Sequence, residues 1–120
     1  MLASDVITSV RRILNDENAG AYRWPTPTLL RYLSEAQFKI YRWRPDLFLD
    51  SSSEIVEPSN ITSAGTTISL AERWREAIAN IVAGKALQED SDDTINQNRA
   101  RYFGVLGREE LRASAPQRNE

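Results

Sequence analysis

The sequence contains no cysteine and no histidine among its 120 residues. The absence of cysteine excludes a disulfide scaffold, a thiolate metal site and a cysteine nucleophile. The absence of histidine removes the commonest general base at neutral pH, the usual zinc ligand and every Ser–His or Cys–His catalytic pair. No recognisable carboxylate pair or phosphate-binding glycine loop replaces them. We therefore expect that the chain is not an enzyme and that it holds no cofactor and no metal.

The sequence also lacks a strong charge of either sign and any long apolar run. Fifteen cationic side chains against seventeen acidic ones give a net charge of −2, which is not typical of a protein that grips nucleic acid over a broad face. No segment approaches the ~18 apolar residues of a membrane span, and the first residues lack the pattern of a signal peptide. We expect a soluble chain that contacts no membrane. Thirteen of the cations are arginine, which is favoured in bidentate contacts at interfaces.

The stretch from Arg23 to Asp46 carries the clearest local signals. Thr26 is a candidate N-cap, and Pro27 suits the first helical position because its φ is already helical. Pro45 disfavours a helical residue before it, so the helix should end at about Arg44. The apolar side chains fall within one half of the helical wheel and are the predicted core seed: Leu29, Leu30, Tyr32, Leu33, Ala36, Ile40, Tyr41 and Trp43.

Apolar periodicity predicts three further helices. They are expected from Ser4 to about Asn15, from Ala71 to about Leu87, and from a cap at Asp92 or Asp93 to about Leu111. Gly104 and Gly107 each lower helix propensity by ~1 kcal/mol relative to alanine and should soften the end of the last helix.

Residues 54–70 lose the helical period. A β-branched pair and an alternating segment, separated by turn formers, predict a two-stranded hairpin or extended arm that must lean on the helices or on a neighbouring subunit. Residues 112–120 are expected to form an extended tail. The predicted fold is mainly α: a small helical bundle of about four helices with an extended β-hairpin arm and an extended C-terminal tail, residues 1–111 forming a single domain.

Phe38 breaks the amphipathic pattern of the predicted second helix. It lies nearly opposite the apolar stripe, between Arg31 and Arg42, so an isolated monomer would expose it. A single exposed aromatic is common; the alternative is an anchor at a subunit interface, where aromatics and arginine are enriched. The candidate oligomer-interface residues are Phe38, Arg31, Arg42, Ile55, Val56 and Ile68.

The acidic run from Glu89 to Asp93 invites a calcium interpretation. An EF-hand loop starting at Asp90 would need glycine and glutamate where the chain has Ile95 and Arg101, so that motif fails. A solvated, helix-capping turn is favoured over a weak cation or partner site. Lys85 falls inside an apolar helical face, and we expect its stem to pass its apolar neighbours so that the amine reaches water.

Arginines recur in pairs, as at Arg11–Arg12 and at Arg99 with Arg101. Adjacent and next-but-one positions point apart on a helix, so the pairs do not make one stripe. Solvated faces and intersubunit salt bridges are favoured over a phosphate-contacting face, which stays open as the alternative.

Several stretches carry a resemblance to a known family. They are Val6, Ile7 and Leu14; Tyr22-Arg23-Trp24-Pro25; Leu29-Leu30-Arg31-Tyr32-Leu33; Arg44-Pro45-Asp46; Glu54-Ile55-Val56-Glu57-Pro58; Thr67-Ile68-Ser69-Leu70; Lys85-Ala86-Leu87-Gln88-Glu89-Asp90; and Asn98-Arg99-Ala100. In these stretches, which span nearly the whole chain, the sequence resembles the small head-to-tail connector, or adaptor, proteins of tailed bacteriophages. Lys85 stands where the family pattern leads us to expect arginine.

The resemblance implies a structural virion protein at the head–tail interface, made in the host cytoplasm. It implies a ring of twelve copies that docks under the portal protein, extends the DNA channel with transient, non-specific contact to genomic DNA, and attaches tail or nozzle proteins. The candidate channel-lining residues are Glu89, Asp90, Asp92 and Asp93. The candidate portal- or tail-docking residues are Arg112, Pro116 and Arg118.

Two other classes stay open. One is a small DNA-binding regulator or a DNA-packaging subunit of a phage, built on a helix-turn-helix. The long predicted loop and the proline-rich entry to the second helix fit that motif poorly, because it uses a turn of three to four residues. The other is a small carboxylate enzyme, for which the sequence offers only scattered acids.

Overall fold

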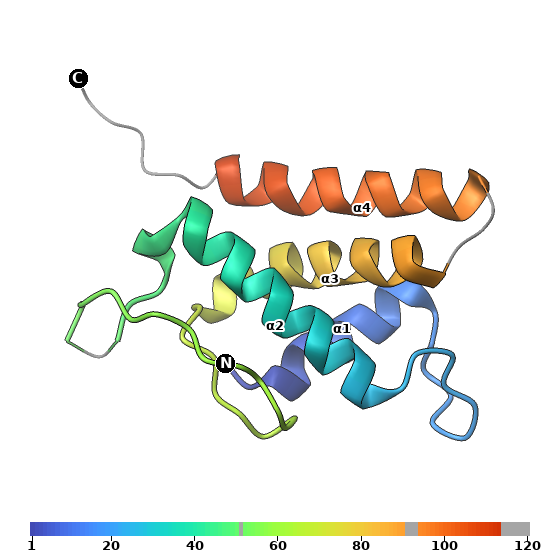
Figure 1. Ribbon diagram of the computed structural model, residues 1–120, viewed down its shortest axis with the longest axis horizontal. Helices are drawn as coiled ribbons and strands as arrows, with labels where there is room; N and C mark the ends of the chain where they lie inside the picture. Colours follow the sequence, from blue (N-terminus) through green and yellow to red (C-terminus); the bar gives the residue numbers. More distant parts are fainter. Residues whose placement is uncertain (51, 91–93, 114–120) are drawn as a thin grey trace.

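The computed structural model describes residues 1–50, 52–90 and 94–113 (Figure 1). Within these ranges the chain forms four α-helices and two short 3₁₀ turns in a flattened body of 46 × 32 × 18 Å. The elements are α1 (Ala3–Leu14), α2 (Thr26–Trp43), η1 (Pro45–Leu47), η2 (Glu72–Trp74), α3 (Arg75–Asp90) and α4 (Thr94–Ala113). The predicted helical bundle is confirmed.

Local signals set the ends of the first two helices. The Asp5 carboxylate accepts a hydrogen bond from the Leu2 N–H at 3.0 Å and lies where an acid complements the helix dipole. Asn15 ends α1 in the left-handed conformation, with φ of 54°. In α2, Pro25 is the N-cap, one residue before the predicted cap, and Arg44 is the C-cap that precedes Pro45. The predicted bounds are therefore correct to within one residue.

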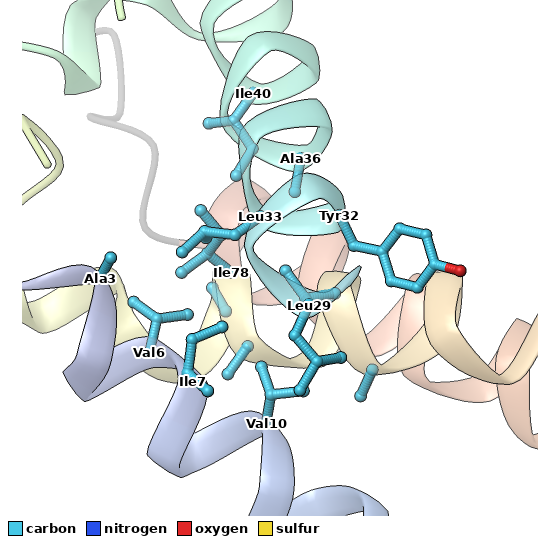
Figure 2. Packing of buried hydrophobic residues seen from close by; sticks show 14 of the residues in the cluster. Ala3, Val6, Ile7, Val10, Leu29, Tyr32, Leu33, Ala36, Ile40 and Ile78 are labelled. Carbon is cyan, nitrogen blue, oxygen red and sulfur yellow. The ribbon is translucent and has the colours of Figure 1, made fainter. Parts of the chain in front are cut away.

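The core lies where α1, α2 and α3 meet. Val6 and Val10 of α1, Leu29 and Leu33 of α2, and Ile78 of α3 are completely or almost completely buried, and Figure 2 shows them facing one another. The core seed predicted on α2 is buried from Leu29 through Ile40, Tyr41 is partly buried, and Trp43 is 44% exposed. Trp43 lies in the last turn of α2 and stays at the surface, although Leu47 and Phe48, which follow it, are buried again.

α3 is the central helix, with α1 and α2 on one side and α4 on the other (Figure 1). Its contacts with α4 are close because both helices carry glycine there. A Cβ added at Gly107 would lie 2.6 Å from the Ala77 carbonyl oxygen, and one at Gly84 would lie 2.8 Å from the Ala100 carbonyl oxygen.

Two sequence-based expectations about α3 and α4 are wrong. α3 does not end near Leu87 but continues to Asp90, because Lys85 and Glu89 pair one turn apart at 2.9 Å and support another turn. α4 does not soften at its glycines, because Gly107 is packed against α3. α4 continues to Ala113 and so includes Arg112.

The predicted β-hairpin arm is also wrong. The described residues contain no β-strand, only isolated antiparallel bridges between Leu2 and Thr67, Phe48 and Leu70, and Leu49 and Ile55. The two segments that were expected to form the hairpin, around Ile55 and from Thr67 to Leu70, therefore pair with other parts of the chain and not with each other. Polar contacts hold the middle of residues 54–70 to α2. The Ser34 hydroxyl accepts a hydrogen bond from the Ile61 N–H at 2.8 Å, and the Gln37 side-chain amide donates one to the Ser59 carbonyl oxygen.

Candidate partner-binding trough between α2 and α4

A trough of about 520 Å³ lies where α2, α3 and α4 meet. Its bottom contains small buried residues, among them Ala36, Gly84 and Ala100. Tyr32 of α2 belongs to the buried cluster, but its ring points away from the other labelled residues in Figure 2 and lines the trough. The lining residues are Tyr32, Glu35, Ala36 and Lys39 of α2, Ile81, Gly84, Lys85 and Gln88 of α3, and Gln97, Ala100, Arg101, Gly104 and Arg108 of α4.

A second hollow of about 410 Å³ continues the trough toward the end of α2. Arg108 lines both, and the hollow also borders Trp43, Val105, Glu109 and Arg112. The trough and this hollow are therefore neighbours at Arg108 of α4.

Arg44, the C-cap of α2, follows Trp43 in the chain and contacts α4. Its guanidinium donates to the Leu111 carbonyl oxygen at 3.2 Å, which ties the C-cap of α2 to the last turns of α4. The same guanidinium donates to both carboxylate oxygens of Asp46, at 3.0 and 2.6 Å. These hydrogen bonds lower the pKa of Asp46 below its ordinary value.

The lining of the trough carries more cations than acids. Lys85 Nζ lies 2.9 Å from a Glu89 carboxylate oxygen and 3.9 Å from one of Glu35, and the hydrogen bond to Glu89 raises the pKa of Lys85. In contrast, Lys39, Arg101 and Arg108 form no ion pair within the described ranges. The trough therefore presents three positive charges without an acidic partner in the described parts of the chain.

Arg11 differs from the trough cations because its guanidinium is buried and paired with an acid. Its side chain is buried at the start of the α1–α2 connection, where Nη1 lies 2.9 Å from Asp16 Oδ2 and 3.0 Å from the Trp24 carbonyl oxygen. Nη2 donates to the Thr26 hydroxyl at 3.0 Å, and the Tyr22 ring lies 3.4 Å from the guanidinium carbon. We call this group, Arg11, Asp16, Tyr22, Trp24 and Thr26, the Arg11 joint.

Asp16 completes the joint by accepting from the chain that follows it. One carboxylate oxygen accepts from the Arg23 N–H at 2.9 Å, and the other accepts from the Trp24 N–H at 3.2 Å. The Trp24 indole N–H donates in turn to the Ala86 carbonyl oxygen of α3 at 3.2 Å. The joint therefore fixes the connection to the core, and Arg11 is not available for phosphate contact.

The candidate interface residues on α2 differ in exposure. Arg31 and Arg42 are exposed on the helix surface. Phe38 is half-buried, so the expectation that an isolated monomer exposes it is wrong. The interface role of these three residues stays a prediction.

The candidate interface residues between positions 54 and 70 also differ in exposure. Ile55 is 55% exposed, Val56 is half-buried, and Ile68 is only 4% exposed. Ile68 belongs to the core because its N–H donates to the Met1 carbonyl oxygen at 2.9 Å, which draws the segment onto the start of α1. Its side chain is thus enclosed within the protomer.

The acidic candidates that the structure describes lie at the end of α3, and the described C-terminal candidate, Arg112, lies in the last turn of α4. Glu89 is exposed and paired with Lys85, and Asp90 is the last residue of α3. Arg112 is exposed and lies 3.8 Å from Glu109. Asp92, Asp93, Pro116 and Arg118 lie outside the described residues, as does the predicted cap of α4.

Sequence reasoning missed the trough, although a signal for it exists. Gln97, Arg101, Gly104 and Arg108 repeat at spacings of three to four residues and therefore share one face of α4. That face combines cations with a glycine, and it contains none of the larger apolar residues that define a core stripe. The spacing does not reveal which helix lies opposite.

The described residues contain neither a candidate metal site nor a candidate membrane-spanning helix. They contain no group of three or more acidic, histidine or cysteine residues that could hold a metal ion, and no helix in them is long and apolar enough to cross a membrane. Comparison of the chain with protein-family models, with curated proteins and with solved structures finds no match.

Proposed function

We propose that the chain is the protomer of a head-to-tail connector ring of a tailed bacteriophage. The proposal rests on the resemblance of stretches that span nearly the whole sequence, and the helical bundle is compatible with it. In this function the protein performs no chemistry. It forms a ring of twelve copies under the portal, extends the DNA channel, and offers an attachment surface to tail or nozzle proteins.

One observation on the protomer carries most of the support. Large apolar side chains remain exposed on more than one surface. Leu49 and Ile55 lie on the loop after η1, and Tyr102 and Val105 lie on α4, with exposed fractions between 43% and 61%. Trp43, Leu2 and Tyr22 are also exposed, at 44%, 41% and 37%. Two different surfaces that both need a partner suit heterologous, head-to-tail contacts, which close into a ring when the rotation between neighbours allows it.

The experiment that tests this function measures the mass and symmetry of the purified protein with and without the portal protein of the same phage. Native mass spectrometry and electron microscopy should reveal a ring of twelve copies bound to the portal. A protein that neither binds the portal nor assembles on it would contradict the proposal.

The C-terminal segment is our candidate for portal or tail docking. A chain truncated after Leu111 should keep its fold, because the core residues and the Arg44 hydrogen bond to the Leu111 carbonyl remain. The truncated chain should bind the portal more weakly than the full chain in a pull-down or by surface plasmon resonance. Undiminished binding would assign docking to another surface.

A DNA-binding regulator or packaging subunit is the second candidate. The three trough cations that form no ion pair within the described ranges favour it, whereas residues 15–25 make a connection between α1 and α2 that is too long for a helix-turn-helix. A salt-dependent shift of a short DNA duplex by the purified monomer would support this candidate.

A further inference from the structure

The loop after η1 presents one short segment in a fixed conformation. Asp50 Oδ1 accepts from the Ser52 and Glu54 N–H groups at 2.8 and 3.0 Å, and the Asp50 N–H donates to the Glu54 carbonyl oxygen at 2.9 Å. The Val56 N–H donates to the Phe48 carbonyl oxygen at 2.8 Å. Binding through this segment would therefore lose little conformational entropy.

The segment Glu54–Glu57 combines apolar and acidic groups. Ile55 is 55% exposed, the highest value among the large aliphatic side chains of the described residues. Glu54 and Glu57 flank the apolar pair Ile55-Val56, both are exposed, and neither forms an ion pair within the described ranges. The segment thus offers an apolar side chain between two uncompensated negative charges.

The trough has the complementary composition. Lys39, Arg101 and Arg108 supply positive charge without a described acidic partner. The rest of the lining mixes apolar or small residues, such as Ile81 and Gly104, with polar ones, such as Gln97. A Cβ added at Gly104 would meet no atom within 4 Å, so this glycine is not needed for helix packing and leaves the trough open.

The segment and the trough of one copy are held apart. The segment is bridged to Phe48 and Leu49, and Phe48 packs edge-on against Tyr41 near the end of α2, with ring centroids 5.5 Å apart. In Figure 1 this loop lies at the left edge of the molecule, while α4 runs along the top. The segment of one copy therefore does not reach the trough of the same copy, and a contact between the two requires a second molecule.

We infer that the trough between α2 and α4 receives segment Glu54–Glu57 of a second copy of this chain. Ile55 enters between the helices, and the two glutamates meet Lys39, Arg101 and Arg108. The inference rests on the proposed ring, because a contact between two different surfaces is the kind that such a ring repeats.

A nucleic-acid backbone fits the trough less well than this segment does. Phosphates would use the cations, but they would leave Ile55 exposed and would not cover the apolar part of the lining, such as Ile81. The net charge of −2 also opposes a polyanion, whereas the segment brings only two carboxylates to three cations.

Because the chain has no cysteine, a disulfide cross-link can test the contact without background. The variant carrying both Ile55→Cys and Gly104→Cys should give a ladder of dimers, trimers and higher species on a non-reducing gel after mild oxidation. An equimolar mixture of the two single variants should stop at the heterodimer, since each molecule then has one reactive surface. The matched control pairs Ile55→Cys with Thr8→Cys, an exposed position on α1 outside the trough, and should give no ladder.

Charge reversal provides a second test that needs no cysteine. Arg101→Glu, or Glu54→Arg with Glu57→Arg, should each weaken self-association by about tenfold or more in sedimentation experiments, because like charges then face each other. Combining the reversals in one chain restores one pair of opposite charges but leaves Lys39 and Arg108 facing the introduced arginines, so it should recover only part of the loss relative to the doubly substituted segment. If Gly104→Cys prevents folding, as judged by circular dichroism, Arg101→Cys on the rim of the trough replaces it.

The outcomes separate this contact from the proposed function. Cross-linking no stronger than in the control pair, or Ile55→Cys homodimers as the main product, would overturn the inference. Rings on the portal without the ladder would leave the connector function standing and this contact wrong. A ladder from a chain that does not bind the portal would support the head-to-tail contact and contradict the connector function.

Discussion

The Arg11 joint and the trough are built from the same kinds of side chain and differ in how their charges are satisfied. In the joint, Arg11 and Asp16 are only 6% and 7% exposed, and hydrogen bonds within the chain occupy both of them. In the trough, Arg101 and Lys39 are exposed and have no acidic partner in the described ranges. An arginine whose donors are used within the fold serves stability, while exposed cations beside an apolar lining are available to another molecule.

The largest expected effect on stability comes from a substitution that breaks the Arg11 joint. Asp16→Ala leaves the Arg11 charge buried without its carboxylate and frees the Arg23 and Trp24 N–H groups, so the free energy of unfolding should fall by about 3–5 kcal/mol. Urea denaturation followed by circular dichroism measures the change. The exposed neighbour variant Glu17→Ala is the control and should stay within about 0.5 kcal/mol of the wild type. A loss in Asp16→Ala as small as in this control would show that the joint is not structural.

The second prediction compares two glycines of α4 that differ only in what surrounds them. Gly107→Ala forces a methyl group against the Ala77 carbonyl and Ile81 and should destabilise the fold by about 1–3 kcal/mol. Gly104→Ala meets nothing and should stabilise it by up to about 1 kcal/mol through helix propensity. Thermal melts of the two variants, measured side by side, should shift in opposite directions. Shifts of the same sign would mean that α4 does not pack on α3 at Gly107 as described.

The third prediction removes charge from the trough. Arg101→Ala and Lys39→Ala should change the free energy of unfolding by no more than about 0.5 kcal/mol, because each side chain is exposed and unpaired within the described ranges. Both variants should nevertheless lose self-association in sedimentation experiments. A large loss of stability would instead assign these cations to the fold, as in the joint.

The smallest effect concerns pH and the ion pair at the rim of the trough. The hydrogen bond from Lys85 lowers the pKa of Glu89 below its ordinary 4.5, so the pair stabilises the fold above that pH and the contribution disappears as pH falls through the lowered value. The same hydrogen bond raises the pKa of Lys85, so at the alkaline end its contribution is complete below pH 10.5 and is lost as pH rises through the raised value.

The variant Glu89→Gln tests the acidic half of this dependence. The difference between its melting temperature and that of the wild type should be small at pH 7, since the pair is solvent-exposed, and should vanish in acid. A difference that grows as the pH falls would have the wrong sign for this pair. Glu72→Gln, which removes an exposed pair with Arg75 on η2, is the matched control for surface charge outside the trough.

The sequence by itself determined the helical part of the fold. Pro25 and Pro45 bracket α2 because proline restricts its own φ and the residue before it. The apolar period identified the buried face from Leu29 to Ile40, since a helix places residues three and four apart on one side. These signals act within a few residues, so the order of the chain is enough to reveal them.

Only the tertiary structure decided how distant segments meet. The Trp24 indole reaches the Ala86 carbonyl 62 residues away, and Arg44 reaches the Leu111 carbonyl 67 residues away. Which arginine is buried, which glycine is packed and where Ile55 lies all follow from such long-range contacts. No periodic signal encodes them, because they depend on the shape of two elements at once, and the trough is the space that three helices leave when they are packed.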